Sequence, residues 1–228
     1  MRKLALSSTI FIFPILLNAQ KDLLDRKWAI SFTAAIIPLT DNGQLGIQPG
    51  MAYHFNNHFL LLTEVTFQTG KNNNADPSFL DKKYMRVKPE MRYFFSKTKG
   101  FGDYIGLQFS YSTRSFTSKS GYYYDHLPGD SIISYDQARI NSPIMTASIQ
   151  AGGMASISRS FMLDGFIGTG IRSINTAYSD VINPQVSQKS ERSGGLRISS
   201  DPAYYHQGSQ IRFHLNFGIR ILYFFPRV

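Results

Sequence analysis

Beyond residue 26, apolar and polar residues alternate along most of the chain. The pattern is clearest over residues 210–225, where every second residue from Ile211 to Phe225 is apolar, and six of the eight residues between them are polar or Gly. An extended strand places alternate residues on opposite faces, whereas a helix would scatter the apolar residues around its circumference. The segment therefore predicts one long strand with an apolar and a polar face. Strands in soluble domains are usually shorter, about five or six residues.

Seven further segments show weaker forms of the same alternation, so eight strands are predicted. They are residues 27–39, 46–55, 58–69, 83–95, 103–116, 142–156 and 160–174. The connections at 56–57, 96–102 and 157–159 are short, and those at 70–82, 117–141 and 175–209 are long. Only the connection at 40–45 breaks this order. Short turns at one end and long loops at the other are typical of a transmembrane barrel whose N-terminus is periplasmic.

The expected fold class is therefore all-β, as an eight-stranded antiparallel up-and-down transmembrane β-barrel. Aromatic residues near the predicted strand ends favour it, because such rings prefer the membrane–water interface. The alternative is a secreted soluble barrel or sandwich. The expected interfacial residues at the periplasmic boundary are Trp28, Phe55, Phe59, Tyr93, Phe95, Phe101, Tyr104, Phe161, Tyr223 and Phe225, and those at the outer boundary are Tyr84, Tyr111 and Phe116.

The N-terminus predicts export. Arg2 and Lys3 precede an apolar stretch, and Ala19 offers a small residue for cleavage. The stretch is short for a membrane anchor, which needs about 20 apolar residues. We expect a cleaved signal peptide at 1–19, a short periplasmic segment at 20–26, a barrel domain at 27–228, and a location in the cell outer membrane.

The amino-acid composition excludes several classes of protein. Charged residues are only 17% of the chain and aromatic residues 14%, with a formal net charge of +9. Disordered chains are rich in charge and poor in aromatic residues, so disorder is excluded. The absence of Cys excludes disulfides, zinc–thiolate sites, Cys nucleophiles and lipid-modified Cys.

Two neighbouring strands carry a resemblance to known proteins. Residues 86–94 contain Pro89, Glu90, Arg92 and Tyr93 in an R-x-x-P-E-x-R-Y-F-like run, and residues 104–107 read Tyr-Ile-Gly-Leu. The chain resembles small eight-stranded outer-membrane proteins of the OmpA-barrel type, and within them the poorly characterised exported barrels that carry such a run. The resemblance implies fold and location and leaves function open. Such barrels typically end on an aromatic residue, whereas here residues 226–228 follow Phe225.

Charged residues on the polar faces would point into the barrel, which in an eight-stranded barrel is filled by side chains. We expect a lumen charge network in which hairpin symmetry places Glu64 opposite Lys88 and Asp164 near Arg220. Its role is either a buried, mutually neutralised structure or an ion path, and the basic excess leaves room for water, an anion or a lipopolysaccharide phosphate near the ends. The expected network comprises Glu64, Arg86, Lys88, Glu90, Arg92, Arg114, Asp164, Arg172, Arg212 and Arg220.

The two longest predicted loops, 117–141 and 175–209, are rich in Tyr and small polar residues. Such loops make adaptable contact surfaces, so they predict a binding site for a protein or glycan, against the alternative of solvated loops lying on lipopolysaccharide. Outer-membrane lipid and lipopolysaccharide are expected partners, and nucleic acid is not. No cofactor or metal is expected. The candidate binding residues are Tyr122, Tyr123, Tyr124, His126, Tyr204 and Tyr205.

We therefore predict a non-enzymatic outer-membrane barrel with a structural or adhesive role. The alternatives are an accessory barrel of an envelope secretion or assembly complex of the PorT-like kind, a narrow channel that prefers anions, and a lipid-modifying enzyme. Only His206 and Ser209 suggest the enzyme, and their spacing in an extended segment places them on opposite faces.

Overall fold

The computed structural model describes residues 27–35, 46–69, 79–95, 102–125, 131–187 and 203–225. This part of the chain is almost entirely β-structure, with one short 3-10 turn, η2 (Ala203–Tyr205). None of its helices is long and apolar enough to cross a membrane. The strands are β1 (Trp28–Ala35), β2 (Gly46–His54), β3 (Phe59–Thr69), β4 (Phe79–Phe94), β5 (Gly102–Asp125), β6 (Ser131–Asn141), β7 (Ile144–Ser156), β8 (Phe161–Ile182), β9 (Gln185–Ser187) and β10 (Gly208–Phe224).

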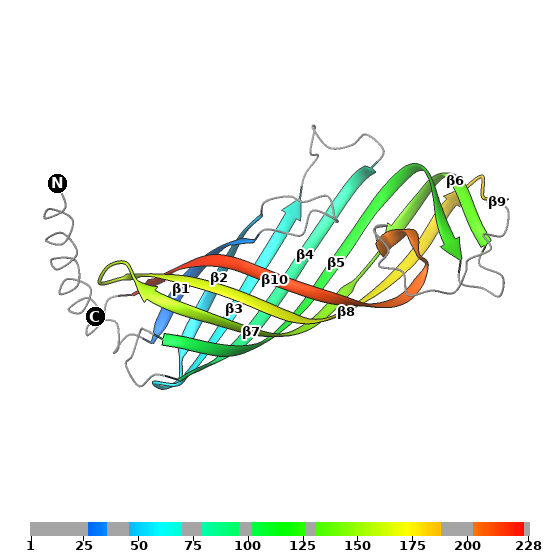
Figure 1. The fold of residues 1–228 in the computed structure, drawn as a ribbon. Coiled ribbons are helices and arrows are strands. Elements are labelled where there is room, and N and C mark those ends of the chain that lie inside the picture. Colours follow the sequence, from blue (N-terminus) through cyan, green and yellow to red (C-terminus); the bar gives the residue numbers. More distant parts are fainter. Residues whose placement is uncertain are drawn as a thin grey trace, which may run out of the picture.

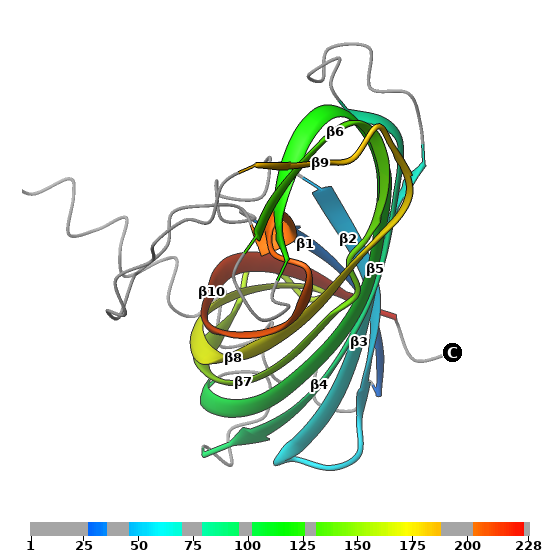
Figure 2. The same ribbon diagram turned by 90° about the vertical axis from the view of Figure 1, so that its right-hand side faces the viewer.

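The strands close into a barrel in which all neighbours run antiparallel. Strands β1 to β5 pair in chain order, β7 lies between β5 and β8, and β10 pairs with both β8 and β1, which closes the ring (Figure 1). A path of paired residues starting at Phe224 on β10 returns to β10 at His214, a stagger of 224 − 214 = 10 residues. Such a stagger tilts the strands around a common axis, as Figure 2 shows from one end. The predicted eight-stranded barrel is confirmed.

The barrel wall has eight strand positions, which we call staves, and strands β6 and β7 together form one of them. Ser142 and Pro143 separate them, and the neighbouring strands still bond to this break: the Ser142 amide donates to the Arg114 carbonyl, and the Asn175 amide donates to the Pro143 carbonyl. Because proline has no N–H to offer the ladder, it marks an interruption of the strand without opening the wall.

The prediction of long loops at 117–141 and 175–209 was wrong. Strand β5 continues to Asp125, where it pairs with β6, and β8 continues to Ile182, where it pairs with the same strand. Within these two ranges, residues 126–130 and 188–202 lie outside the described residues. We call the end of the barrel that carries β6 and β9 the loop end and the opposite end, with the turns at 55–58 and 157–160, the turn end (Figure 1).

The outward face shows where the barrel is apolar. On β5 the outward residues are apolar from Ile105 to Tyr111 and polar from Thr113 to Lys119. On β8 the same change follows Ile171. A transmembrane strand needs only about 9–11 residues. Strand β5 has 24 residues and β8 has 22, so part of each strand extends beyond the apolar belt. We call residues 113–125, β6, residues 173–182 and β9 the extension.

This boundary explains the failed loop prediction. Beyond the apolar belt, a strand no longer needs one apolar face, so hydrophobic alternation weakens while backbone pairing continues. The extended strands are held by hydrogen bonds to each other, which composition does not reveal.

Aromatic residues surround the turn end as expected. The Trp28 and Tyr53 rings lie 4.5 Å apart, and the Phe161 and Tyr223 rings 5.0 Å apart. Two predictions of this kind were wrong: Tyr104 and Phe116 point into the barrel and are buried. Both occupy even positions on β5, whose even side chains face the lumen as far as Ser118. Several predicted features lie outside the described residues. They are the signal peptide at 1–19, the periplasmic segment at 20–26, Phe101 and residues 226–228.

Candidate functional site in the lumen and at the loop end

The turn end of the lumen is closed by an apolar plug to which every stave contributes. Its side chains are all buried, and the Tyr104 hydroxyl is the one oxygen or nitrogen atom that they carry. The plug consists of Ala29, Ala52, Leu60, Leu62, Phe94, Tyr104, Met154, Met162, Phe166, Leu222 and Phe224. Close packing of this kind excludes water.

Sequence reasoning missed the apolar plug, although the chain carries a signal for it. Leu60 and Leu62 interrupt the alternation of β3, and Leu222 and Phe224 are the two apolar exceptions on the polar face of β10. All four lie at the turn ends of their strands and face inward. Apolar residues on both faces of a strand end therefore mark a place where the barrel is closed.

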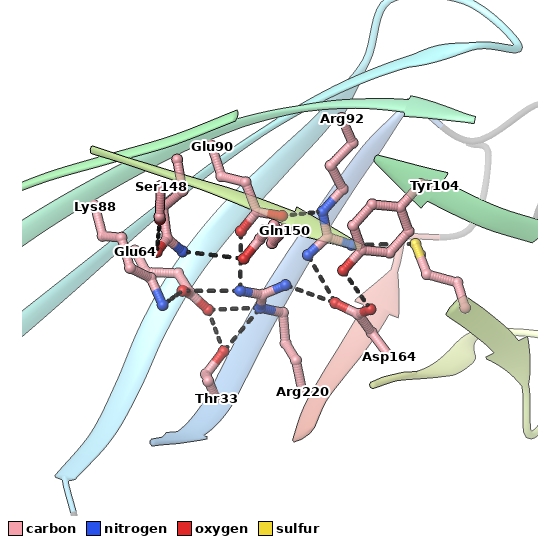
Figure 3. Close-up of polar contacts among 12 residues, drawn as sticks. Thr33, Glu64, Lys88, Glu90, Arg92, Tyr104, Ser148, Gln150, Asp164 and Arg220 are labelled. Atoms are coloured by element: carbon pink, nitrogen blue, oxygen red, sulfur yellow. Dashed lines mark hydrogen bonds and ion pairs between the residues drawn. The ribbon is translucent and has the colours of Figure 1, made fainter. Parts of the chain in front are cut away.

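Above the apolar plug, toward the loop end, lies an ion-pair cluster centred on Arg220 (Figure 3). Its Nη1 donates to Asp164 Oδ2 at 2.6 Å, its Nη2 to Glu90 Oε2 at 3.1 Å, and its Nε to Glu64 Oε1 at 2.7 Å. Nε also donates to the Thr33 hydroxyl oxygen at 2.8 Å. One guanidinium thus joins three carboxylates that come from three different strands.

Arg92 forms the second half of the ion-pair cluster. Its Nη2 donates to Asp164 Oδ2 at 2.7 Å, and its Nε donates to Glu90. Asp164 Oδ1 accepts a further hydrogen bond of 2.9 Å from the Tyr104 hydroxyl. The Arg92 guanidinium lies 4.2 Å above the Tyr104 ring, so the ion-pair cluster rests directly on the apolar plug.

The ion-pair cluster is electrically neutral. The cations of Lys88, Arg92 and Arg220 are matched by the three carboxylates of Glu64, Glu90 and Asp164, and Lys88 pairs with Glu64. The side chains of Arg92 and Arg220 are fully buried. A buried charge costs several kcal/mol unless it is paired and hydrogen-bonded, and here each charge has a partner.

Both cross-strand pairs expected from hairpin symmetry are present in register: Glu64 lies opposite Lys88, and Arg220 opposite Asp164. Sequence reasoning did not find the contacts between Arg220 and Glu64 or between Arg92 and Asp164. These join strands on different sides of the barrel, and only closure of the wall brings them together.

A layer of amide side chains follows, which we call the amide layer: Gln48, Gln108, Gln150 and Asn216. Asn216 Nδ2 donates to Gln108 Oε1 at 2.8 Å, and the Ser148 hydroxyl donates to the same oxygen at 3.3 Å. Gln48 and Gln150 are each 1% exposed. These groups separate the ion-pair cluster from the remaining lumen charges.

The other four residues of the expected network, Arg86, Arg114, Arg172 and Arg212, lie nearer the loop end and are not part of the ion-pair cluster. Arg172 and Arg212 are opposite each other in register on β8 and β10. Arg114 donates to the Ser142 hydroxyl at 3.1 Å and lies 5.5 Å from the Tyr204 ring centre. The expected network thus divides into a neutral ion-pair cluster and a separate basic group.

Aromatic residues cover the lumen at the loop end. Tyr204 of η2 packs edge-on against Phe116 with ring centres 5.4 Å apart, and Ile140 completes the contact. The Tyr178 hydroxyl donates to the Tyr204 carbonyl. We call Phe116, Ile140, Tyr178 and Tyr204 the aromatic cap. It ties η2 to β5, β6 and β8.

The candidate loop residues divide between two surfaces. Tyr122 stacks on Tyr205 with ring centres 5.0 Å apart, and Tyr124 stacks on His206 at 4.9 Å. Tyr123 faces the other way and stacks on Tyr178 at 4.1 Å. The buried positions of β5 change parity between Ser118 and Tyr123, and Ser120 between them has φ 52°. His126 lies outside the described residues.

Burial affects the phenols of the extension. It raises the pKa of Tyr178 above the ordinary range, and the neighbouring phenols of Tyr135 and Tyr204 add to the effect. Burial also raises the pKa of Tyr135, and that of Tyr123, where the Asp125 carboxylate contributes. The neutral form of these groups is therefore favoured in the folded protein.

The arrangement offers little for catalysis. His206 is buried against Tyr124, whereas Ser209 is exposed. Among the described residues, no three His, Asp or Glu side chains are arranged to hold a metal ion.

A closed antiparallel barrel with an apolar outer belt and a charged interior defines the class of transmembrane β-barrels, because closure is what lets a sheet satisfy every backbone group within a bilayer. No family model matches the chain, and no curated protein matches it. Among solved structures, Acinetobacter baumannii CarO has a TM-score of 0.39 at 9% identity, covering 86% of this chain and 97% of its own. CarO2 from the same organism has a TM-score of 0.37 at 7% identity, with coverages of 88% and 99%.

Proposed function

We propose that this protein is a non-enzymatic, non-conducting outer-membrane barrel that binds a partner through the extension. The observation that carries the proposal is the contrast between the two ends. The turn end of the lumen is filled by the apolar plug and the neutral ion-pair cluster. At the loop end, paired strands carry aromatic side chains beyond the apolar belt.

The filled lumen disfavours the channel alternative. A conducting path would have to pass the ion-pair cluster and then the apolar plug, whose side chains come from all eight staves. Breaking buried pairs costs several kcal/mol for each pair. In planar bilayers we expect the wild-type protein to give no steady conductance, and a stable open level would contradict the non-conducting part of the proposal.

The aromatic stack on the extension supports surface binding. Tyr122 is 39% exposed and is backed by Tyr205 in a nearly parallel stack, 8° between ring planes. Rigid tyrosine faces supply contact area at low entropic cost and suit sugar rings or protein side chains. The partner alternatives expected from the sequence, a glycan or a protein, both remain compatible with such a surface.

Binding of the purified barrel to immobilised glycans, and photo-crosslinking from position 122 on intact cells, test the two alternatives. Tyr122→Ala should reduce binding at least about tenfold, because stacked aromatic anchors concentrate binding energy. Tyr93→Ala is the matched control, since Tyr93 has the same residue type and 40% exposure at the opposite end of the barrel. Equal loss in both variants, or no glycan binding and no crosslinked partner, would overturn the surface-binding role.

A further inference from the structure

The hydrogen-bond ladder between β2 and β3 stops before either strand ends. The two strands pair from the turn end up to Gly50 and Glu64. Beyond that point, residues 46–49 remain paired with β1 and residues 65–69 remain paired with β4, but the two segments do not pair with each other. We call residues 46–49 and 65–69 the seam. Along the seam, the described wall of the barrel is open toward the loop end.

The position of Pro49 explains why the seam begins where it does. Successive backbone amides of a strand point toward opposite neighbouring strands. On β2, the Phe55 amide donates to the Phe59 carbonyl, on the β3 side. The His54 amide donates to the Lys27 carbonyl, on the β1 side. Odd positions of β2 therefore face β3, and at position 49 the proline has no N–H to donate to that strand.

A second proline in the wall shows how the seam differs from an ordinary break. At Pro89 the ladder between β4 and β5 is interrupted, but pairing resumes at Val87 and Tyr111. At Pro49 the pairing with β3 does not resume. Unpaired backbone groups are tolerated at membrane depth only where they lie against protein or line a polar cavity. The seam therefore calls for an occupant that forms hydrogen bonds.

The outer and inner sides of the seam differ in chemistry. On the outer side, Pro49 is exposed, Val65 is half-buried and Phe67 is 67% exposed. Val65 lies in register with Val87, which in turn lies opposite Tyr111 of the apolar belt. The outer rim of the seam is thus an apolar surface that faces the acyl chains of the membrane.

The inner side of the seam carries polar groups that lack hydrogen bonds. Gln48 is 1% exposed, and neither of its amide atoms has a hydrogen-bond partner among the described residues. Arg86, in register with Thr66 of the seam, has a buried Nε that likewise has no such partner in the described part of the chain. Buried polar groups in native proteins are bonded to protein, water or ligand. The inner side therefore offers two donor groups and one acceptor.

The seam opens onto a lumen that is closed at both ends. Below the seam, Glu64 is paired with Lys88 and Arg220, and the apolar plug fills the turn end. The aromatic cap covers the lumen at the loop end. The seam therefore gives the inward amide of Gln48 an approach from the surrounding membrane.

We propose that the seam admits the head group of a neutral, single-chain amphiphile of the monoacylglycerol class from the membrane. Its hydroxyl and ester groups both donate and accept hydrogen bonds, as the Gln48 amide requires, while its acyl chain stays against Phe67 and the apolar rim. Glu64 and Lys88 beside the seam already pair with each other, which favours a neutral head group. The strands are still joined at Gly50 and Glu64, so the seam is narrow and takes one acyl chain.

Binding is tested on the full mature protein in phosphatidylcholine vesicles, with a monoacylglycerol that carries a photoactivatable diazirine in its acyl chain as the probe. Irradiation should label β2 and β3 beside the seam, as mass spectrometry of the labelled peptides will show. Unlabelled monoolein should compete. Methyl oleate, which has the same chain without hydroxyl groups, and glycerol, which has the head group without a chain, should not.

Each competitor has an outcome that overturns the proposal. Competition by methyl oleate as strong as that by monoolein would mean that the apolar rim alone binds the chain. Competition by glycerol would mean that the head group enters from water and not from the membrane. Competition by oleate but not by monoolein would assign a charged head group.

Three variants test the residues that carry the proposal. Gln48→Leu keeps the size of the side chain and removes the amide, so the probe fraction for half-maximal labelling should rise at least about tenfold. Pro49→Val returns a donor to the ladder and should suppress labelling while the folded band on gels stays at least as heat-resistant. Pro89→Val returns a donor at the break that is already closed, and it should be labelled as wild type.

Wild-type labelling of folded Gln48→Leu and Pro49→Val would show that the seam is not a binding site. Should Pro49→Val fail to fold, Gln48→Leu alone decides.

Discussion

Arg220 and Asp164 face each other in register across β10 and β8, and Arg220 Nη1 lies 2.6 Å from Asp164 Oδ2. The same carboxylate oxygen accepts a hydrogen bond from Arg92 Nη2 at 2.7 Å. Asp164 therefore pairs with two buried guanidinium groups at once.

Asp164→Asn should be strongly destabilising. The amide retains the size of the carboxylate but leaves Arg92 and Arg220 short of one negative charge in a fully buried site, which costs about 3–5 kcal/mol. Urea unfolding in lipid vesicles measures the change. Asp180→Asn is the control, because Asp180 is exposed with φ 50°, a conformation that Asn tolerates, and it should stay within about 0.5 kcal/mol of wild type.

Glu64→Gln should cost more than Lys88→Gln. Glu64 serves both Lys88 and Arg220, so its loss leaves two cations poorly paired, whereas loss of Lys88 leaves Glu64 still bonded to Arg220. We expect a difference of roughly 1–2 kcal/mol in the free energy of unfolding. The same sharing means that the double exchange Glu64→Lys with Lys88→Glu restores stability only in part. Equal costs for the two single variants would show that Arg220 does not depend on Glu64.

Two glycines on β8 should respond oppositely to alanine. A Cβ at Gly170 would lie 2.1 Å from the Ala147 carbonyl oxygen, so the backbone would have to move, at a cost of roughly 1–3 kcal/mol. A Cβ at Gly165 would meet nothing within 4 Å. Gly165→Ala should be neutral or stabilising by up to about 1 kcal/mol, because it restricts the unfolded chain. The midpoint of heat-dependent gel mobility compares the two, and destabilisation by Gly165→Ala would contradict the placement of that position.

Alkaline pH should loosen the extension before the barrel. The pKa values of Tyr178, Tyr135 and Tyr123 are raised in the folded state, so their stabilising effect is complete below about pH 10, the pKa of a free tyrosine, and is lost as the pH rises above it. Limited proteolysis from pH 8 to about pH 11 should show increasing cleavage within β6 and β8. The activity of the protease itself at each pH is measured on an unfolded substrate and used to correct the cleavage rates.

Tyr178→Phe separates ionisation from packing. It removes the phenol and its hydrogen bond to Tyr204, so cleavage should be somewhat faster at pH 8 but should rise less steeply with pH. Cleavage that rises with pH as steeply in this variant as in wild type would mean that Tyr178 ionisation does not contribute.

Much of the barrel could be predicted because strand alternation is a local property. The pattern Ile211 to Phe225 requires one face in lipid and one in the lumen, and the same rule found all eight staves. Hairpin symmetry also predicted the pairs Glu64–Lys88 and Asp164–Arg220, since adjacent strands joined by one turn have little freedom in register. These rules ended two strands at residues 116 and 174, whereas pairing beyond the apolar belt carries β5 on to Asp125 and β8 on to Ile182.

The order of apolar and polar residues by itself predicted a membrane barrel with charges inside, because alternation along eight strands gives each strand one face for lipid and one for the lumen. Which charges meet was decided only by the tertiary structure. The ten-residue stagger brings Arg220 to Glu64 and Glu90, and Arg92 to Asp164. Contacts across a barrel depend on how the wall closes on itself, and that closure is a property of all eight staves together.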